Sequence, residues 1–152
     1  ADVIVITRTD QANNANEILD DVRKLAGDVP IFSSGMRTAP LTPLNDLSEP
    51  LVPPVAAFCA VGNPGSFFNA IADEVVTQKT FPDHHRYSQP EIDALIEIAK
   101  RAGAKSLITT AKDAVKLKDL SFSLPCYVLE IELQIENEEE LIRLILSAAN
   151  QG

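Results

Sequence analysis

The sequence lacks the elements of several common functional sites. Its two cysteines, Cys59 and Cys126, lie in apolar runs without metal-like spacing, so they predict buried thiols in a reducing compartment. None of its six glycines is followed by lysine, and the G-x-x-x-x-G-K-S/T loop that holds a nucleoside triphosphate is therefore missing from it. No apolar run approaches the roughly 18 residues of a membrane-spanning helix.

Positive charge is also scarce. The 152 residues include 13 Lys and Arg against 22 Asp and Glu, a formal net charge of −9. Such a surface repels a phosphate backbone, so we expect no nucleic acid partner. With 45% hydrophobic residues, the chain is large enough to form one globular domain around its own core.

The chain begins without an initiator methionine and enters an apolar run at once, at residues 3–7. A chain that starts inside a buried strand looks like a piece of a larger molecule. We therefore expect a fragment.

Short β-branched runs alternate with amphipathic stretches along the chain. This pattern predicts an α/β fold, with a mostly parallel sheet covered by helices on both faces. The predicted strands are residues 3–7, 29–32, 55–61, 75–81, 106–110 and 126–133, and helices are expected to begin near residues 13, 63, 88 and 137.

The segment from about residue 33 to residue 54 interrupts this alternation. It holds five of the ten prolines, and proline removes a backbone donor and restricts its neighbour. A loop of this length in a compact domain is usually a lid, a wrap or a connector. We interpret it as a connector.

Three polar clusters stand at or near the carboxyl ends of predicted strands. They are Arg8-Thr-Asp10, Asp83-His-His-Arg86, and Lys112-Asp113 with Lys116. The carboxyl ends of parallel strands share one rim, where open α/β sheets bind ligands. Arginine and lysine suit phosphate oxygens, and a histidine can take a proton from an attacking hydroxyl. The pattern favours phosphoryl transfer.

The triplet Asp83-His84-His85 has two other interpretations. It fits a solvated polar turn, and it also names a class of manganese-dependent phosphoesterases. The latter need further aspartates from separate strand ends, and Asp10 is the one plausible second ligand near a strand end. Pro82 also breaks the strand directly before the triplet. We therefore expect no metal site here.

Four blocks of the sequence, in order, resemble those of the tetraacyldisaccharide 4′-kinase (lipid A 4′-kinase) family. They are Ala1-Asp-Val-Ile-Val-Ile-Thr-Arg8, Phe58-Cys-Ala-Val-Gly-Asn-Pro-Gly-Ser-Phe-Phe68, Phe81-Pro-Asp-His-His-Arg-Tyr87 and Thr110-Ala-Lys-Asp-Ala-Val-Lys116. The resemblance implies an enzyme that transfers the γ-phosphate of ATP, with Mg²⁺, to the 4′-hydroxyl of a tetraacyldisaccharide 1-phosphate lipid A precursor. It also implies a location at the cytoplasmic face of the bacterial inner membrane.

The resemblance places this chain in the C-terminal half of such a kinase. In the family a Walker loop and a membrane-associating segment precede the block that matches Ala1. ATP and Mg²⁺ are therefore expected to be bound mainly by the absent N-terminal half, which would also make peripheral contact with the membrane. The chain alone is expected to be inactive.

The resemblance also assigns roles to single residues. His84 corresponds to the histidine that assists deprotonation of the sugar hydroxyl, and Asp83 orients its loop. His85 matches less strictly and is interpreted as an ordinary surface residue. Arg8 corresponds to an arginine at a strand end that faces phosphate. From its place in the polar cluster Asp83-His-His-Arg86, and not from the resemblance, Arg86 is also expected to bind substrate or phosphate.

The last block departs from the family pattern. Ala111 stands where the family usually has glutamate, so Lys112 and Asp113 are expected either to bind substrate phosphate or nucleotide, or to support the structure. The departure also keeps open a second class of function. The chain could be a non-catalytic interaction domain that retains the fold.

Overall fold

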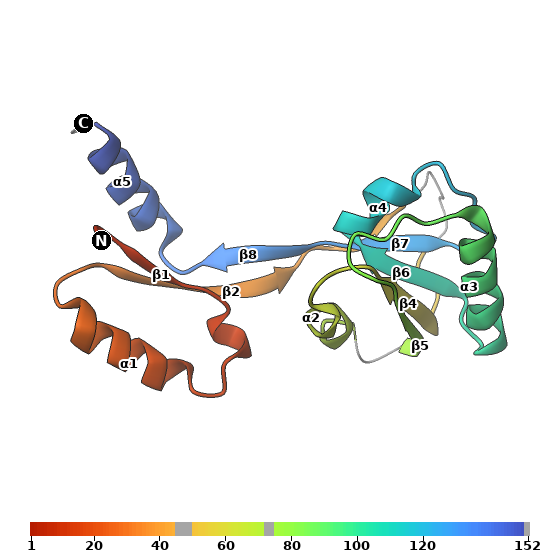
Figure 1. Cartoon of the computed structure of the whole chain (residues 1–152), viewed down its shortest axis with the longest axis horizontal. Helices are drawn as coiled ribbons and strands as arrows, with labels where there is room; N and C mark the ends of the chain where they lie inside the picture. Colours follow the sequence, from red (N-terminus) through yellow and green to blue (C-terminus); the bar gives the residue numbers. More distant parts are fainter. Residues whose placement is uncertain (45–49, 72–74, 151–152) are drawn as a thin grey trace. The chain divides into compact units, whose positions relative to one another are not determined.

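The computed structural model describes residues 1–44, 50–71 and 75–150 (Figure 1). The chain forms two compact units, one comprising Ala1–Arg37 with the chain from Glu132 onward, the other Thr38–Ile131. The strands form two sheets, not the one sheet that the sequence predicted. The α/β class is confirmed.

The first unit is built on a three-stranded sheet in the order β1-β2-β8, with β1 at Ile4–Ile6, β2 at Ile31–Thr38 and β8 at Ile131–Ile135. Strands β1 and β2 are parallel. Glu136 N donates to Ser33 O and Ala39 N to Glu130 O, both at 2.9 Å. The numbers of these partners run in opposite directions, so β8 is antiparallel to β2. The 3₁₀ turn η1 (Thr9–Gln11) and helices α1 (Ala15–Ala26) and α5 (Glu138–Ala149) complete the unit.

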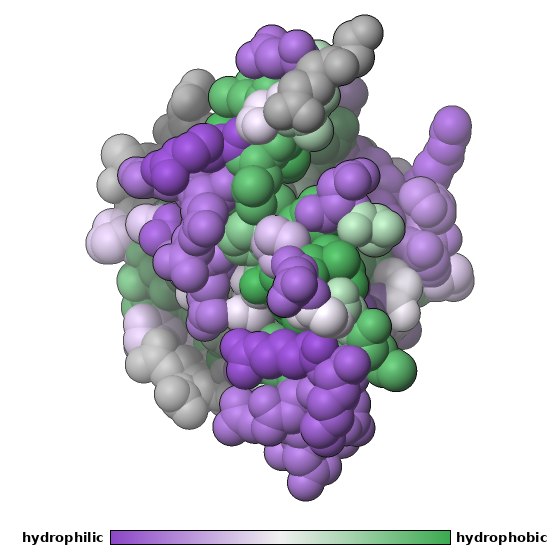
Figure 2. Space-filling model, turned by 90° about the vertical axis from the view of Figure 1, so that its left-hand side faces the viewer, coloured by the Kyte–Doolittle hydropathy of each residue, from purple (hydrophilic) through white to green (hydrophobic). Residues whose placement is uncertain are grey.

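The helices of the first unit leave apolar side chains at the surface. No residue of α1 is buried, and Leu141 is the one buried residue of α5. Leu25 is 89% exposed, and α5 exposes about half of Ile142, Ile145 and Leu146. Figure 2, in which the left-hand side of Figure 1 faces the viewer, shows hydrophobic side chains at the surface among hydrophilic ones. Little apolar surface is buried within this unit.

The second unit contains a five-stranded sheet in the order β3-β7-β6-β4-β5. Strands β7 (Cys126–Leu129), β6 (Ser106–Thr110), β4 (Val55–Cys59) and β5 (Val75–Thr80) are mutually parallel, and the short edge strand β3 (Thr42–Pro43) is antiparallel to β7. The sheet is therefore mostly parallel, as the sequence predicted. The central strands β4 and β6 are buried along their whole length.

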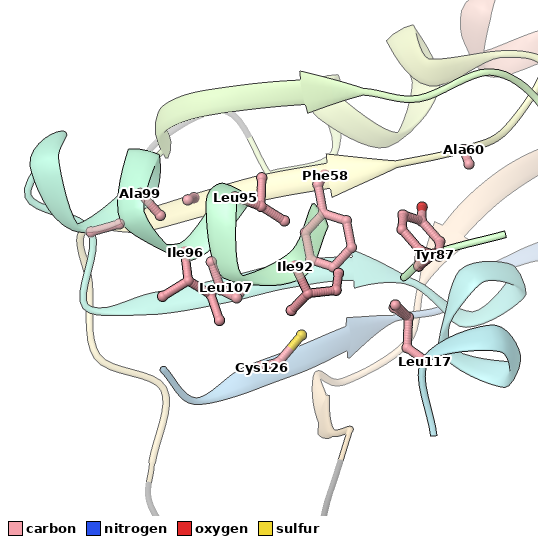
Figure 3. Close-up of a cluster of buried hydrophobic side chains, with 12 residues drawn as sticks. Phe58, Ala60, Tyr87, Ile92, Leu95, Ile96, Ala99, Leu107, Leu117 and Cys126 are labelled. Carbon is pink, nitrogen blue, oxygen red and sulfur yellow. The ribbon is translucent and has the colours of Figure 1, made fainter. Parts of the chain in front are cut away.

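Two hydrophobic clusters cover the two faces of this sheet. Because strand side chains alternate between faces, Ala56, Phe58 and Ala60 belong to one cluster, while Val55, Ala57 and Cys59 belong to the other. Helix α3 (Gln89–Arg101) packs on the first face through Ile92, Leu95, Ile96 and Ala99 (Figure 3). Helix α2 (Pro64–Asn69) packs on the second through Phe67. Helices therefore cover both faces.

Several predicted boundaries are wrong, for local reasons. Strand β2 continues to Thr38 and so includes the first residues of the predicted connector. The connector's first proline is Pro40, so no proline interrupts the strand before that point. The last predicted strand, 126–133, is two strands in different sheets: β7 is fully buried, whereas β8 is largely exposed. Helix α4 (Ala111–Leu117) was not predicted. Residues 45–49 of the predicted connector lie outside the described residues.

None of the helices in the described part of the chain is long and apolar enough to cross a membrane.

We expect Phe58→Ala to lower the free energy of unfolding by about 3–5 kcal/mol, because Phe58 is fully buried and its removal leaves a cavity. Urea denaturation followed by circular dichroism measures the change. The matched control is Val115→Ala on the same unit, where the side chain is 68% exposed; we expect a change within about 0.5 kcal/mol. Similar losses in both variants would contradict this packing.

Candidate active site

The two histidines lie in a tight turn that follows strand β5. His85 N donates to Pro82 O at 3.1 Å, which closes a four-residue turn. His84 occupies its third position with φ +60°, the sign of φ that a type II turn requires there. A left-handed conformation is uncommon for a residue other than glycine. The turn therefore holds His84 in a conformation that its neighbours must maintain.

Asp83 ties this turn to helix α4. Its Oδ1 accepts hydrogen bonds from His84 N at 3.0 Å and from Lys112 Nζ at 3.4 Å. Gly62, after strand β4, also comes close, because a Cβ at that position would lie 3.5 Å from Asp83 Oδ2. Desolvation raises the pKa of Asp83, but the hydrogen bonds from Lys112 and His84 N outweigh it and hold the pKa below its usual value. The carboxylate is thus ionised where it joins the two elements.

The ring of His84 is not held by Asp83. The side chain of His84 is 75% exposed, and its Nε2 lies 3.7 Å from Asp83 Oδ2, beyond hydrogen-bond distance. Asp83 therefore orients the backbone of the turn and leaves the imidazole open to solvent. An exposed imidazole on a fixed turn is able to take a proton from a bound substrate.

His85 is not the ordinary surface residue that the sequence suggested. Its side chain is 21% exposed, and Nε2 lies 3.0 Å from Glu91 Oε1 at the start of α3. Its ring stacks on Phe81, with centroids 4.9 Å apart, and meets Tyr87 edge-on at 5.1 Å. Residue type alone did not indicate these contacts, because Phe81 and Glu91 are separated from His85 by four and six positions.

Asp113 is fully buried at the carboxyl ends of the central strands. Its Oδ2 accepts from Ala60 N at 2.8 Å and from Thr110 Oγ1 at 2.9 Å, and its Oδ1 accepts from Lys116 Nζ at 3.3 Å. Asp113 N in turn donates to Thr110 Oγ1, which caps helix α4. Of the two roles that the sequence left open for Asp113, the buried position favours structural support over contact with substrate.

A cavity of about 620 Å³ opens beside the histidine turn, lined by His84, Arg86, Tyr87 and Lys116. Two cationic side chains and an imidazole therefore meet at one place on an acidic chain. Tyr87 is buried, and its pKa is raised by that burial and by the nearby charge of Asp113, so its hydroxyl remains protonated. These groups suit an anionic ligand such as a phosphate.

The structure brings together two of the three predicted polar clusters. Lys112 contacts Asp83, and Lys116 lines the same cavity as His84 and Arg86. The third cluster, which contains Arg8, belongs to the first unit. There Arg8 adopts φ +60° just before η1 and accepts a backbone hydrogen bond from Gln11. Sequence reasoning did not identify Tyr87 or Glu91 as parts of the site.

The described residues contain no group of three or more histidine, cysteine, aspartate or glutamate side chains placed to hold a metal ion. Asp10, the ligand that the phosphoesterase interpretation required, lies in the first unit, whereas the Asp-His-His triplet lies in the second.

Comparison with known proteins identifies the family. The family model described as tetraacyldisaccharide-1-P 4′-kinase matches residues 1–150. The chain belongs to this family. The tetraacyldisaccharide 4′-kinase of Rickettsia canadensis is 36% identical over 114 residues, which cover 73% of this chain and 34% of that protein. The corresponding protein of Rickettsia typhi is 32% identical over 152 residues, covering 98% of this chain and 42% of that protein. The chain therefore spans less than half the length of these relatives.

A solved structure of the tetraacyldisaccharide-1-P 4′-kinase family shares the fold. LpxK from Aquifex aeolicus, crystallised as an apo form in complex with ATP, superposes with a TM-score of 0.52 at 22% identity. The match covers 96% of this chain and 52% of that one. At this level of identity the likeness concerns the fold.

We expect Asp113→Ala to lower the free energy of unfolding by about 3–5 kcal/mol, because it leaves Ala60 N and the Lys116 ammonium without their partner. Thermal and urea denaturation measure the loss. Lys112→Ala is the matched control, since it breaks a half-exposed ion pair on the same helix; we expect a change below about 1 kcal/mol. A stability loss for Asp113→Ala no larger than the control's would contradict the structural role.

Both cysteines should resist alkylation in the folded protein. Burial, together with the nearby charge of Asp113, raises the pKa of Cys59 to about 11, and burial raises that of Cys126 as well. At pH 8 on the order of one Cys59 thiol in a thousand is then ionised. We expect iodoacetamide at pH 8 to label neither thiol in the native state and both after unfolding in urea, as measured by mass spectrometry. Rapid labelling of native Cys59 would contradict this environment.

Proposed function

We propose that this chain is the C-terminal part of an enzyme that transfers the γ-phosphate of ATP to the 4′-hydroxyl of a tetraacyldisaccharide 1-phosphate lipid A precursor. The observation that carries the proposal is the match of residues 1–150 to the tetraacyldisaccharide-1-P 4′-kinase family. The geometry of the second unit supports it, because an exposed histidine stands beside a cavity with basic lining. Family membership favours this activity over a phosphoesterase or a non-catalytic interaction domain.

His84 is the proposed catalytic base. Its imidazole takes the proton of the 4′-hydroxyl as the sugar oxygen forms a bond to the γ-phosphorus of ATP. The bond from that phosphorus to the bridging oxygen of the β-phosphate breaks, and ADP leaves. The imidazole is exposed, and Asp83 Oδ2 lies 3.7 Å from its Nε2, beyond hydrogen-bond distance. The turn itself is tied to helix α4 through Asp83 and Lys112.

Basic side chains at the cavity contact phosphate oxygens in this proposal. Arg86 offers a planar fork, and Lys116 is held by Asp113 at the cavity wall. Lys112 stands next to them through its ion pair with Asp83. Arg8 of the first unit is proposed to contact phosphate as well. Asp113 acts by supporting Lys116 and the strand ends, and not by touching substrate.

ATP and any Mg²⁺ are proposed to be held mainly outside this chain. None of the six glycines precedes a lysine, and the described residues include no cluster of histidine, cysteine, aspartate or glutamate side chains placed to hold a metal ion. The relatives are more than twice as long as this chain, which leaves room for such a segment. The exposed apolar faces of α1 and α5 are suited to pack against it.

The lipid substrate implies a place of action at a membrane. We propose that the enzyme works at the cytoplasmic face of the inner membrane, where peripheral contact is made by the remainder of the protein. The chain by itself is proposed to be inactive, because it lacks a loop for the triphosphate.

Replacing His84 tests the proposal. In the full-length protein, we expect His84→Ala to lower kcat by about 10²–10⁴-fold, the usual value of general base assistance, and to leave the KM for ATP nearly unchanged. Phosphate transfer from radiolabelled ATP to the tetraacylated disaccharide 1-phosphate measures the rate. Stability should change little, because the ring is exposed and supports no core.

Two controls accompany this variant. Arg101→Ala, exposed at the C-terminal end of α3, should retain full activity. The 152-residue chain alone should transfer no phosphate. Wild-type kcat in His84→Ala would contradict the role of His84, and the absence of any transfer by the full-length protein would contradict the proposed activity itself.

A further inference from the structure

The side chain of His85 packs into the folded unit. Its Nε2 lies 3.0 Å from Glu91 Oε1, its ring stacks on Phe81 at 4.9 Å, and Tyr87 meets it edge-on at 5.1 Å. The ring is thus fixed in position and in rotation. By contrast, the neighbouring ring of His84 is 75% exposed.

The partners of His85 are themselves rigidly placed. Phe81 N donates to Cys59 O at the end of the central strand β4, at 2.8 Å. Glu91 accepts from Ser88 N at 2.9 Å and from Ser88 Oγ at 2.7 Å, in the capping box that starts helix α3. Tyr87 is buried in the hydrophobic cluster that also contains the apolar residues of α3, and its ring lies next to that of Phe58 (Figure 3). Through these three contacts His85 joins the turn to a strand and to a helix at once.

The turn depends on such an anchor. His84 holds φ +60°, a conformation that costs energy for a residue other than glycine and persists only where the surroundings impose it. The hydrogen bond from His84 N to Asp83 Oδ1 lies within the turn. The contact of Asp83 with Lys112 on α4 is a half-exposed ion pair, a weak constraint. His85 is the next residue along the chain, and its own N closes the turn onto Pro82 O.

We propose that His85 is a positioning residue, which holds the Pro82–His85 turn so that the imidazole of His84 meets the acceptor hydroxyl in a productive geometry. This inference rests on the proposed function, since it concerns the base of that reaction. Displacements of about 1 Å at a reacting group are able to cost on the order of 10²-fold in rate. His85 itself touches no substrate; it acts through His84.

Kinetics of variants in the full-length protein test the proposal. We expect His85→Ala to lower kcat by about 10-fold or more while the KM for ATP stays within about 2-fold. His85→Gln should restore kcat to within about 3-fold of wild type, because the Gln Nε2 stands the same number of bonds from Cβ as the His Nε2 and so reaches Glu91. Gln89→Ala, which removes contacts to Asp93 and Ser121 at the same helix start, is the matched control and should retain wild-type kcat.

A double variant separates positioning from general damage. If His85 acts only through His84, then His85→Ala should cost nothing further in a His84→Ala background. Full multiplication of the two losses would contradict the proposal, as would equal impairment of His85→Ala and His85→Gln. A loss of folded protein would appear as a lowered thermal midpoint, and the Ala and Gln variants should differ in kcat even where their midpoints agree.

The outcomes also distinguish this inference from the proposed function. A large loss in His84→Ala beside an unimpaired His85→Ala would overturn the positioning role alone. Full activity in His84→Ala would overturn the catalytic role of His84 and this inference with it.

Discussion

One buried carboxylate holds the site together. Asp113 is fully buried, yet it accepts hydrogen bonds from the backbone of Ala60, from Thr110 and from Lys116. Ala60 follows strand β4 and Thr110 ends strand β6, so a single side chain joins the carboxyl ends of the two central strands. A buried charge is tolerated only when such partners surround it. The rim at which Lys116 and the histidine turn lie therefore depends on this one group.

The two adjacent histidines of the turn differ in their surroundings. His84 is exposed and held by its backbone, whereas His85 is enclosed by aromatic rings and a carboxylate. The energetic cost of the left-handed conformation at His84 is offset by contacts that its neighbours make. Strain of this kind is commonly found where a side chain must be presented in one direction. The ring of His84 is thus open to solvent, whereas the ring of His85 is enclosed by its neighbours.

Local charge at the rim runs against the charge of the whole chain. The chain carries a formal net charge of −9, yet Arg86 and Lys116 line the cavity beside His84, and Lys112 stands at Asp83. The net charge of the chain governs long-range attraction and repulsion. The binding of a ligand at the rim depends instead on the few charged groups within several ångströms of it. An acidic chain is thus able to offer a local site for phosphate, although it repels an extended phosphate backbone.

Much of the fold was determined by the sequence itself. Local preferences predict the strand at residues 106–110 and the helix that begins after Ser88. Strands β4, β6 and β7 are parallel, as the sequence predicted for most of the sheet. The four ordered blocks were enough to indicate the family. All of these signals are local in the sequence, because each depends on residues within one element or one turn.

Only the tertiary structure decided how those elements combine. The division into two sheets depends on which strands pair across the chain, and no local pattern marks the change of sheet between β7 and β8. The sequence left the role of Asp113 open, because its partner Ala60 N lies 53 positions away. The sequence predicted His85 to be an ordinary surface residue, because its contacts with Phe81 and Glu91 exist only once the turn has formed. Burial and hydrogen-bond satisfaction are properties of the packed chain, so residue type alone could not show that Asp113 is buried or that His85 is enclosed.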